Sequence, residues 1–242
     1  MFFSVSLLLK KWSMETIYLL LGFIMVFGLI TLWGLKNPQR KKAKTYDLFF
    51  SLRNTFKMLK DQKVLLLIPN AVAGGFLLGL VLSTVPVLIE TEFGLNWVGV
   101  ITSIWHLTLA FFSLGGGILS DIKGRFPVIY TSIFMGILAV VFLLSVKTLP
   151  TIALVMFLVG LQGSLGSSAG SALNIDLFEE KIKEASAALG IYTLLLGTTP
   201  SFLLNQFLSP DQLFILAVAF SILGGTCIRI LQTKFRPSQS LS

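Results

Sequence analysis

The sequence predicts an all-α integral membrane protein with seven transmembrane helices, on three observations. Of its 242 residues, 55% are hydrophobic and only 12% are charged, and the mean hydropathy is +0.87. Ordinary soluble domains carry about 25% charged residues, so most of this chain has lipid as its solvent. Seven apolar runs reach the roughly 20 residues that a helix needs to cross a bilayer. The runs do not alternate polar and apolar residues, which indicates helices and not barrel strands.

The runs are joined by connections of very unequal charge. The predicted spans are 15–35, 64–89, 98–120, 127–146, 151–173, 187–208 and 213–231. Segment 36–63 carries nine Lys or Arg and two Asp, whereas the next connection, 90–97, has two Glu and no basic residue. The positive-inside rule therefore places the long basic loop and the C-terminus in the cytoplasm. An odd number of spans then puts the N-terminus outside the cell membrane.

This arrangement divides the chain into five parts. They are an apolar external stump (1–14), a first transmembrane helix (15–35), a basic cytoplasmic loop (36–63), a six-helix bundle (64–231) and a cytoplasmic tail (232–242). The basic loop contains an amphipathic pattern, with apolar residues on one helical face and basic residues beside it: Leu48, Phe49, Leu52, Phe56 and Leu59, next to Arg53, Lys57 and Lys60. Such a helix lies on an anionic lipid leaflet or packs against the cytoplasmic mouth of the bundle; both interpretations stay open.

Composition argues against several kinds of chemistry. The chain has one cysteine, Cys227, and one histidine, His106, which cannot form an intrachain disulfide or a His/Cys metal cluster. The net charge of +8 is assigned to cytoplasmic loops and not to nucleic-acid binding. Ser164 sits in a turn-like Gly-Ser-Leu-Gly sequence, but a serine hydrolase needs a base within reach, and the only histidine precedes this serine, opposite to the rhomboid order. We therefore expect no enzyme activity, metal or cofactor.

The short link between the third and fourth spans holds the most specific motif, Gly117, Asp121, Gly124 and Arg125. Gly124 can take the positive φ that a tight turn needs. Gly117 can let a neighbouring helix come close. Asp121, at the membrane edge, can cap a helix N-terminus, and Arg125 can pair with a carboxylate across an interface. The four residues predict a latch between helices, against the alternative of an ordinary polar turn.

These four positions resemble the loop signature G-x-x-x-D-x-x-G-[RK] of the major facilitator superfamily. In that family the signature follows the second helix of each half and stabilises the closed cytoplasmic gate, and a long basic loop joins the halves. The resemblance implies that this chain holds the sixth helix, the central loop and the C-terminal half of a twelve-helix transporter. It further implies two three-helix repeats, a small-molecule substrate, and a complementary N-terminal half or a second copy as partner.

The resemblance also places the second, third, fifth and sixth spans around a central cavity. Polar or aromatic residues on these spans are the cavity candidates: His106, Gln162, Asn70, Trp105, Tyr192 and Phe76. Ordinary packing is the alternative for the aromatic residues, and a bond to a neighbouring carbonyl is the alternative for His106. Because the set has no fixed charge, we expect a small amphipathic or hydrophobic solute.

Small residues mark where helices come close. Gly75 and Gly79 form one G-x-x-x-G pattern, and Gly166 and Gly170 form another, which permits close backbone packing and rocking of one helix pair on another. Pro200 lies inside the sixth span, where it removes a backbone donor and frees a carbonyl near Thr198.

The predicted function is transport of a small solute by alternating access. Two alternatives stay open: a non-transporting subunit or remnant of a split transporter, and a seven-helix receptor. Six helices line only half of a transport pathway, which motivates the first alternative. The receptor is disfavoured because no lysine lies in the middle of the last span and no cysteine pair can link the external face. Two related three-helix units are expected only for the transporter.

Overall fold

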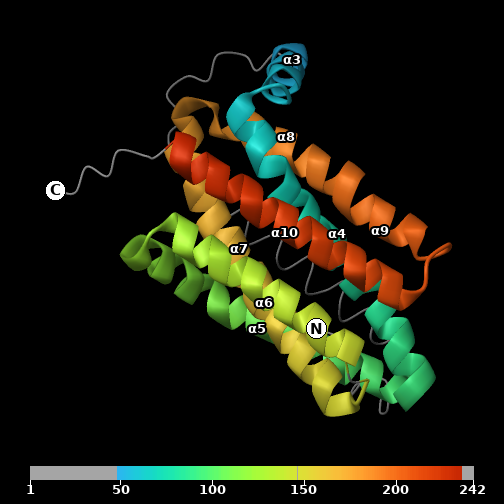
Figure 1. Ribbon diagram of the computed structural model, residues 1–242. Helices are drawn as coiled ribbons and strands as arrows, with labels where there is room; N and C mark the ends of the chain where they lie inside the picture. The colour runs from blue at the N-terminus through green and yellow to red at the C-terminus, as the bar shows by residue number, and fades with distance from the viewer. Residues whose placement is uncertain (1–47, 146, 236–242) are drawn as a thin grey trace, which may run out of the picture.

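The computed structural model describes residues 48–145 and 147–235, and all regular elements within them are helices (Figure 1). They are α3 (Leu48–Met58), α4 (Gln62–Phe93), α5 (Leu95–Lys123), α6 (Arg125–Ser145), α7 (Leu149–Phe178), the 3-10 turn η1 (Glu179–Lys181), α8 (Ile182–Tyr192), the π-helix η2 (Thr193–Thr198), α9 (Thr199–Leu204) and α10 (Pro210–Lys234). The predictions for the external stump, for the first transmembrane helix and for most of the tail lie outside the described residues.

Five described helical stretches are long and apolar enough to cross a membrane: α4, α5, α6, the continuous stretch Leu149–Leu204, and α10. The stretch Leu149–Leu204 has two arms, because α7 ends at Phe178 and Glu179 has a φ of 39° where the chain turns. The second arm consists of α8, η2 and α9 and is called the α8–α9 arm below. The all-α membrane fold predicted from the sequence is confirmed, and the last six predicted spans overlap in order with α4, α5, α6, α7, the α8–α9 arm and α10.

The helices pair in a pattern with internal symmetry. Both α5 and α6 pack along α7, both the α8–α9 arm and α10 pack along α4, and α6 packs on α10. Exchanging the triplet α4, α5, α6 with the triplet α7, α8–α9, α10 leaves this pattern unchanged. The bundle therefore consists of two related three-helix units, with α4 and α7 as their equivalent first helices.

Pro200 accounts for an irregularity in the α8–α9 arm. Proline has no N–H, so the carbonyl of Leu196, four residues earlier, loses its α-helical donor. The turns before the proline are widened into the six-residue π-helix η2. The helix-breaking effect predicted for Pro200 thus takes the form of a π-helix, a feature that often occurs at functional positions.

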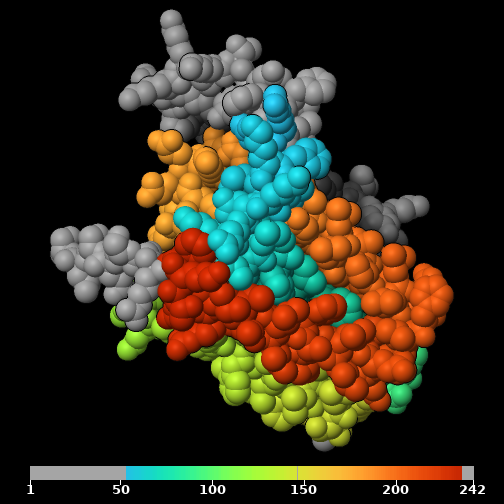
Figure 2. All heavy atoms as spheres, turned by 45° about the horizontal axis from the view of Figure 1, so that its top comes forward, coloured from blue at the N-terminus to red at the C-terminus, as the bar shows by residue number. Residues whose placement is uncertain are grey.

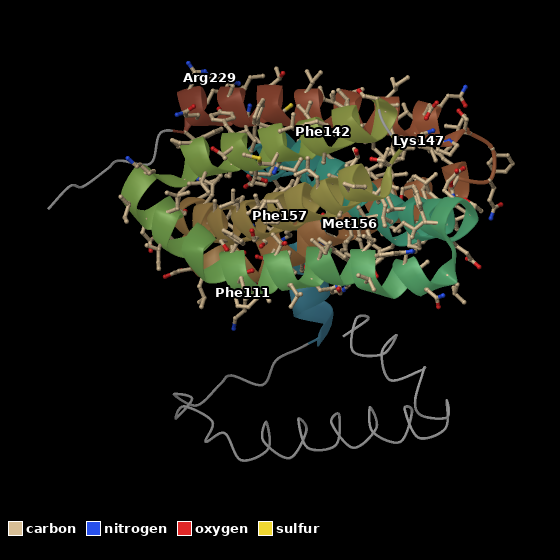
Figure 3. The ribbon with its side chains drawn as sticks, turned by 90° about the horizontal axis from the view of Figure 1, so that it is seen from below. Phe111, Phe142, Lys147, Met156, Phe157 and Arg229 are labelled. Atoms are coloured by element: carbon tan, nitrogen blue, oxygen red, sulfur yellow. The ribbon has the colours of Figure 1, made fainter. Side chains whose placement is uncertain are left out.

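Two hydrophobic clusters stabilise the bundle at its two ends. Leu80, Met156 and Phe214 belong to the first cluster, and Val64 and Leu173 belong to the second. Figure 3 shows Arg229 and Lys147 at opposite ends of the bundle, with Met156 between them. We call the end that carries Arg229 and the turn between α5 and α6 the signature end, and the end that carries Lys147 the opposite end.

The short helix α3 sits at the signature end, beside α8 (Figure 1). Thr55 and Met58 are buried, and the Tyr192 hydroxyl donates a hydrogen bond to the Leu59 carbonyl at 3.2 Å. Arg53 and Phe56 are exposed on the same helix. The face of α3 that carries Thr55 and Met58 therefore packs against this end of the bundle, whereas Phe56, which belongs to the apolar face predicted from the sequence, is exposed.

Three of the four predicted packing glycines lie at close helix contacts. A Cβ atom at Gly75 would lie 2.7 Å from the Thr193 carbonyl oxygen, and one at Gly166 would lie 2.6 Å from the Ser132 hydroxyl. Gly79 is pressed against the Ser201 side chain. The prediction is wrong for Gly170, which has open space where a side chain would go. Pairs of small residues at four-residue spacing do not reveal which glycine faces a neighbour.

The neighbouring glycines Gly74 and Gly75 provide a matched test of this close packing. Both lie inside α4, so replacement by alanine gives both the same gain in helix propensity. Only Gly75 meets a backbone atom, so we expect Gly75→Ala to lower the free energy of unfolding in detergent by about 1–2 kcal/mol. Gly74→Ala should leave it unchanged or raise it. Equal stabilities of the two variants would contradict the observed contact.

Candidate functional site

The turn at the signature end holds Arg125 between two carboxylates. Gly124, with a φ of 89°, separates α5 from α6 and places Arg125 at the first position of α6. The Arg125 guanidinium forms an ion pair with Asp121 on the last turn of α5. Its Nε also donates to Asp176 Oδ2 on the last turn of α7 at 3.1 Å, and its Nη1 donates to the Ser120 hydroxyl at 3.2 Å. One side chain thus joins the ends of three helices.

The exposure of the two carboxylates differs. The Asp176 side chain is 33% exposed, whereas that of Asp121 is 69% exposed. In the described part of the chain Asp121 pairs with Arg125 and does not cap a helix N-terminus, which corrects the role expected from the dipole argument. Because most of its surface is open, Asp121 can accept a further donor.

Two details of the motif differ from the sequence interpretation. Gly117 has open space at its Cβ position, whereas a Cβ at Gly116 would lie 3.1 Å from the Ser164 carbonyl oxygen on α7. The close approach predicted at Gly117 is therefore made by Gly116. The sequence predicts that Arg125 pairs with a carboxylate but does not identify Asp176 as that partner. Asp176 could have been proposed because it is the only acidic residue of α7.

A central cavity of about 460 Å³ lies at mid-depth in the bundle. It is bounded by α4, α5, α6, α7, η2 and α10, and the side chains of Asn70, Trp105 and Gln162 line it together with Ser132, Ser167 and Thr193. Among the described residues that line it, none is ionisable. The volume falls within the range of small-molecule sites, and the wall is apolar with a few neutral polar groups.

A second space of about 200 Å³, the end cavity, continues toward the signature end. It shares Asn70 and Ser167 with the central cavity and is also lined by Leu67 on α4 and by Leu173 and Asn174 on α7. The two cavities adjoin at these shared residues, and the space between α4 and α7 that they make up, lined as far as Asn174 on α7, is called the path below.

The structure brings together three of the six predicted cavity residues and places the others elsewhere. Asn70, Trp105 and Gln162 meet at the central cavity. Phe76 is fully buried in a hydrophobic cluster, with its ring 5.2 Å from that of Phe220. Tyr192 bonds the Leu59 carbonyl near α3. Phe76 and Tyr192 are thus packing residues and not cavity residues. Ordinary packing is the alternative that the sequence analysis gives for aromatic side chains.

His106 does not line either cavity. Its ring lies 4.5 Å from the Trp105 ring, and its Nδ1 is 3.1 Å from the Thr102 carbonyl of the preceding helical turn. This contact agrees with the alternative in which the imidazole bonds a neighbouring carbonyl. Within residues 48–145 and 147–235 no three His, Cys, Asp or Glu side chains come together as a metal site would require.

The Arg125–Asp176 contact can be measured by a double-mutant cycle. Both side chains are at least two-thirds buried, and they join α6 to α7. We expect Arg125→Gln and Asp176→Asn to show a coupling energy of about 0.5–1 kcal/mol for unfolding in detergent. The control pair, Arg125→Gln with Glu180→Gln, should show none, because Glu180 is exposed beyond the end of α7. A coupling of zero in both cycles would contradict the contact.

Comparison with known proteins agrees with this architecture. A family model described as Major Facilitator Superfamily matches residues 2–204. Searches of curated proteins and of solved structures found no match. The family match spans more than four-fifths of the chain, from the N-terminal region through α9. With its two three-helix units, its central cavity and the Arg125 turn at one end, the chain belongs to the major facilitator superfamily.

Proposed function

We propose that this chain forms one half of a transport pathway that moves a small, neutral, amphipathic solute across a cell membrane by alternating access. The observation that carries the proposal is the central cavity, whose wall lacks ionisable side chains and holds the carboxamides of Asn70 and Gln162. Membership of a transporter family supports transport as the activity, and the cavity chemistry supports the class of solute.

The absence of charge from the cavity wall is the argument for a neutral solute. An ion moved from water into this space would lose hydration without gaining a counter-charge from this half of the pathway, at a cost of several kcal/mol or more. Carboxamides can both donate and accept hydrogen bonds, and the Trp105 indole offers a flat apolar surface. A solute with a hydroxyl, amide or carbonyl group on an apolar body fits this wall.

The signature end is the proposed cytoplasmic side. The basic segment 36–63 leads into α4 at this end, and α10 ends here with Arg229 and Lys234. At the opposite end Lys147 is paired with Asp211 at 3.2 Å, so that end has no comparable excess of basic residues in its turns. The positive-inside rule then predicts a cytoplasmic C-terminus and an external N-terminus.

The second half of the pathway is assigned to a complementary six-helix unit or a second copy of the chain. Apolar side chains with more than half of their surface exposed follow one another along α5 at spacings of three and four residues: Leu107, Phe111, Leu114, Ile118 and Ile122. Figure 3 shows Phe111 at the outer edge of the bundle. The stripe ends beside the exposed carboxylate of Asp121. A partner on this face of α5 would pack apolar side chains on the stripe and could donate a hydrogen bond to this carboxylate.

Substitution of a cavity carboxamide tests the class of solute. The probes are a neutral amphipathic fluorophore and its anionic and cationic analogues, measured as uptake into membrane vesicles that contain the expressed chain. We expect uptake of the neutral probe only, and Gln162→Leu should reduce it about tenfold through loss of a hydrogen bond in an apolar site. The control Gln206→Leu lies between α9 and α10, away from the cavity. Uptake of a charged analogue alone would refute the neutral-solute proposal.

Neutralisation of Asp121 tests the role of the signature turn as a gate. Asp121→Asn removes one partner of Arg125 at the ends of α5 and α6. We expect slower uptake of the neutral probe, because the contact that holds α5 to α6 at this end is lost. Membrane insertion should be unchanged, because the apolar spans are not altered. Glu180→Gln serves as the control for loss of an exposed carboxylate at the same end. Uptake equal to that of the unmodified chain would remove Asp121 from the gate.

A further inference from the structure

Lys63 makes a contact that the signature motif does not include. Its ammonium Nζ donates a hydrogen bond to the Leu177 carbonyl at 3.0 Å and lies 5.6 Å from the centre of the Phe235 ring. Lys63 is the second residue of α4, Leu177 is in the last turn of α7, and Phe235 follows the end of α10. Figures 1 and 2 show these three segments together at the signature end. A single ammonium group thus connects the two triplets.

The acceptor in this contact is a backbone carbonyl at the C-terminus of α7. The last carbonyls of an α-helix have no donor within the helix, and they carry the negative end of the helix dipole. The turn at Glu179 ends α7, so the Leu177 carbonyl is left to an external donor. The ammonium supplies that donor and a positive charge, and the face of the Phe235 ring adds a cation–π contact.

The contact lies next to the end cavity. Leu67 lines the end cavity one helical turn after Lys63 on α4, and Asn174 lines it three residues before Leu177 on α7. The Lys63–Leu177 hydrogen bond therefore bridges the same two helices just beyond the last residues of the path. Directly beneath it Val64, Leu67 and Leu173 are buried in one hydrophobic cluster.

We propose that Lys63, bound to the Leu177 carbonyl, closes the path between α4 and α7 at the signature end, and that this contact must release when the path opens there. Lys63 is a positioning residue that acts by holding the ends of α4 and α7 together above a layer of apolar side chains. Its role in the passage of solute rests on the proposed function, whereas the closure itself can be measured without any solute.

The test measures water access to the layer beneath the ammonium. In the whole chain with Cys227→Ser, the reporter is Leu67→Cys, at a position 6% exposed in the structure. Open membrane sheets are treated with 2-hydroxyethyl methanethiosulfonate, a small reagent without charge, so that a change of charge at position 63 does not alter its local concentration. The labelling rate is compared for Lys63→Met, Lys63→Arg and Lys60→Met.

We expect Lys63→Met to raise the labelling rate of the reporter about tenfold, in line with loss of one charge-assisted hydrogen bond. Lys63→Arg keeps a cationic donor and should label at nearly the parent rate. Lys60→Met removes an exposed lysine three residues earlier and should have no effect. Should Lys63→Met fail to accumulate in membranes, Lys63→Gln, which keeps a donor without the charge, is expected to give a smaller rise.

Two results would overturn the closure. One is a labelling rate in Lys63→Met, or in its Gln substitute, that equals the rate in Lys60→Met. The other is a rise in Lys63→Arg as large as that in Lys63→Met, which would mean that the cationic donor does not set the closed state. A chain that shows the expected labelling pattern but takes up no probe would retain the closure and refute transport by copies of this chain alone.

Discussion

The bundle depends on one constraint of the lipid environment, which is that every buried polar atom must find its partner within the protein. Within the described residues, no buried side-chain nitrogen or oxygen lacks a hydrogen bond. Thr102, Thr108 and Ser221 meet the constraint by donating to the carbonyl four residues earlier in their own helices. Because these hydroxyls are satisfied locally, they can lie at helix contacts without requiring a polar neighbour. Association of the helices then rests on close packing, with a few hydrogen bonds between helices such as that from the Ser132 hydroxyl to the Gln162 carbonyl.

The same constraint explains where the charged contacts are. The ion pairs of Arg125 and Lys147 and the Lys63 contact lie at the two ends of the bundle, where water can hydrate the remaining polar atoms. The end of α7 receives two of them, since Asp176 binds Arg125 and the adjacent Leu177 carbonyl binds Lys63. One triplet contributes both cations, from α6 and α4, and the other contributes both acceptors. The end of α7 is therefore the place where the two triplets are joined electrostatically.

Features set by local sequence could be predicted, and features set by distant contacts could not. The five described stretches that can cross a membrane follow from runs of apolar residues. The positive φ at Gly124 follows from the short link between two spans, where a glycine can make the tight turn. Asp176 lies 51 residues from Arg125, and Lys63 lies 114 residues from Leu177, so no spacing rule connects them. For the same reason the sequence could not distinguish Gly116, which touches α7, from Gly117, which does not. Facing direction is a property of the packed bundle and not of one helix.

The cavity residues illustrate the same limit and its consequence for transport. Asn70, Gln162 and Phe76 were equivalent candidates in the sequence, yet Phe76 packs against Phe220 while the two carboxamides face the central space. An aromatic ring gains most free energy by complete burial, whereas a carboxamide at mid-depth needs a hydrogen-bonding partner or a wet surface. The cavity supplies that surface. Under the proposed function, a solute hydroxyl or amide replaces water at these carboxamides with hydrogen bonds of the same kind. Under this proposal, neutral polar side chains therefore suit a site that must both bind and release its solute.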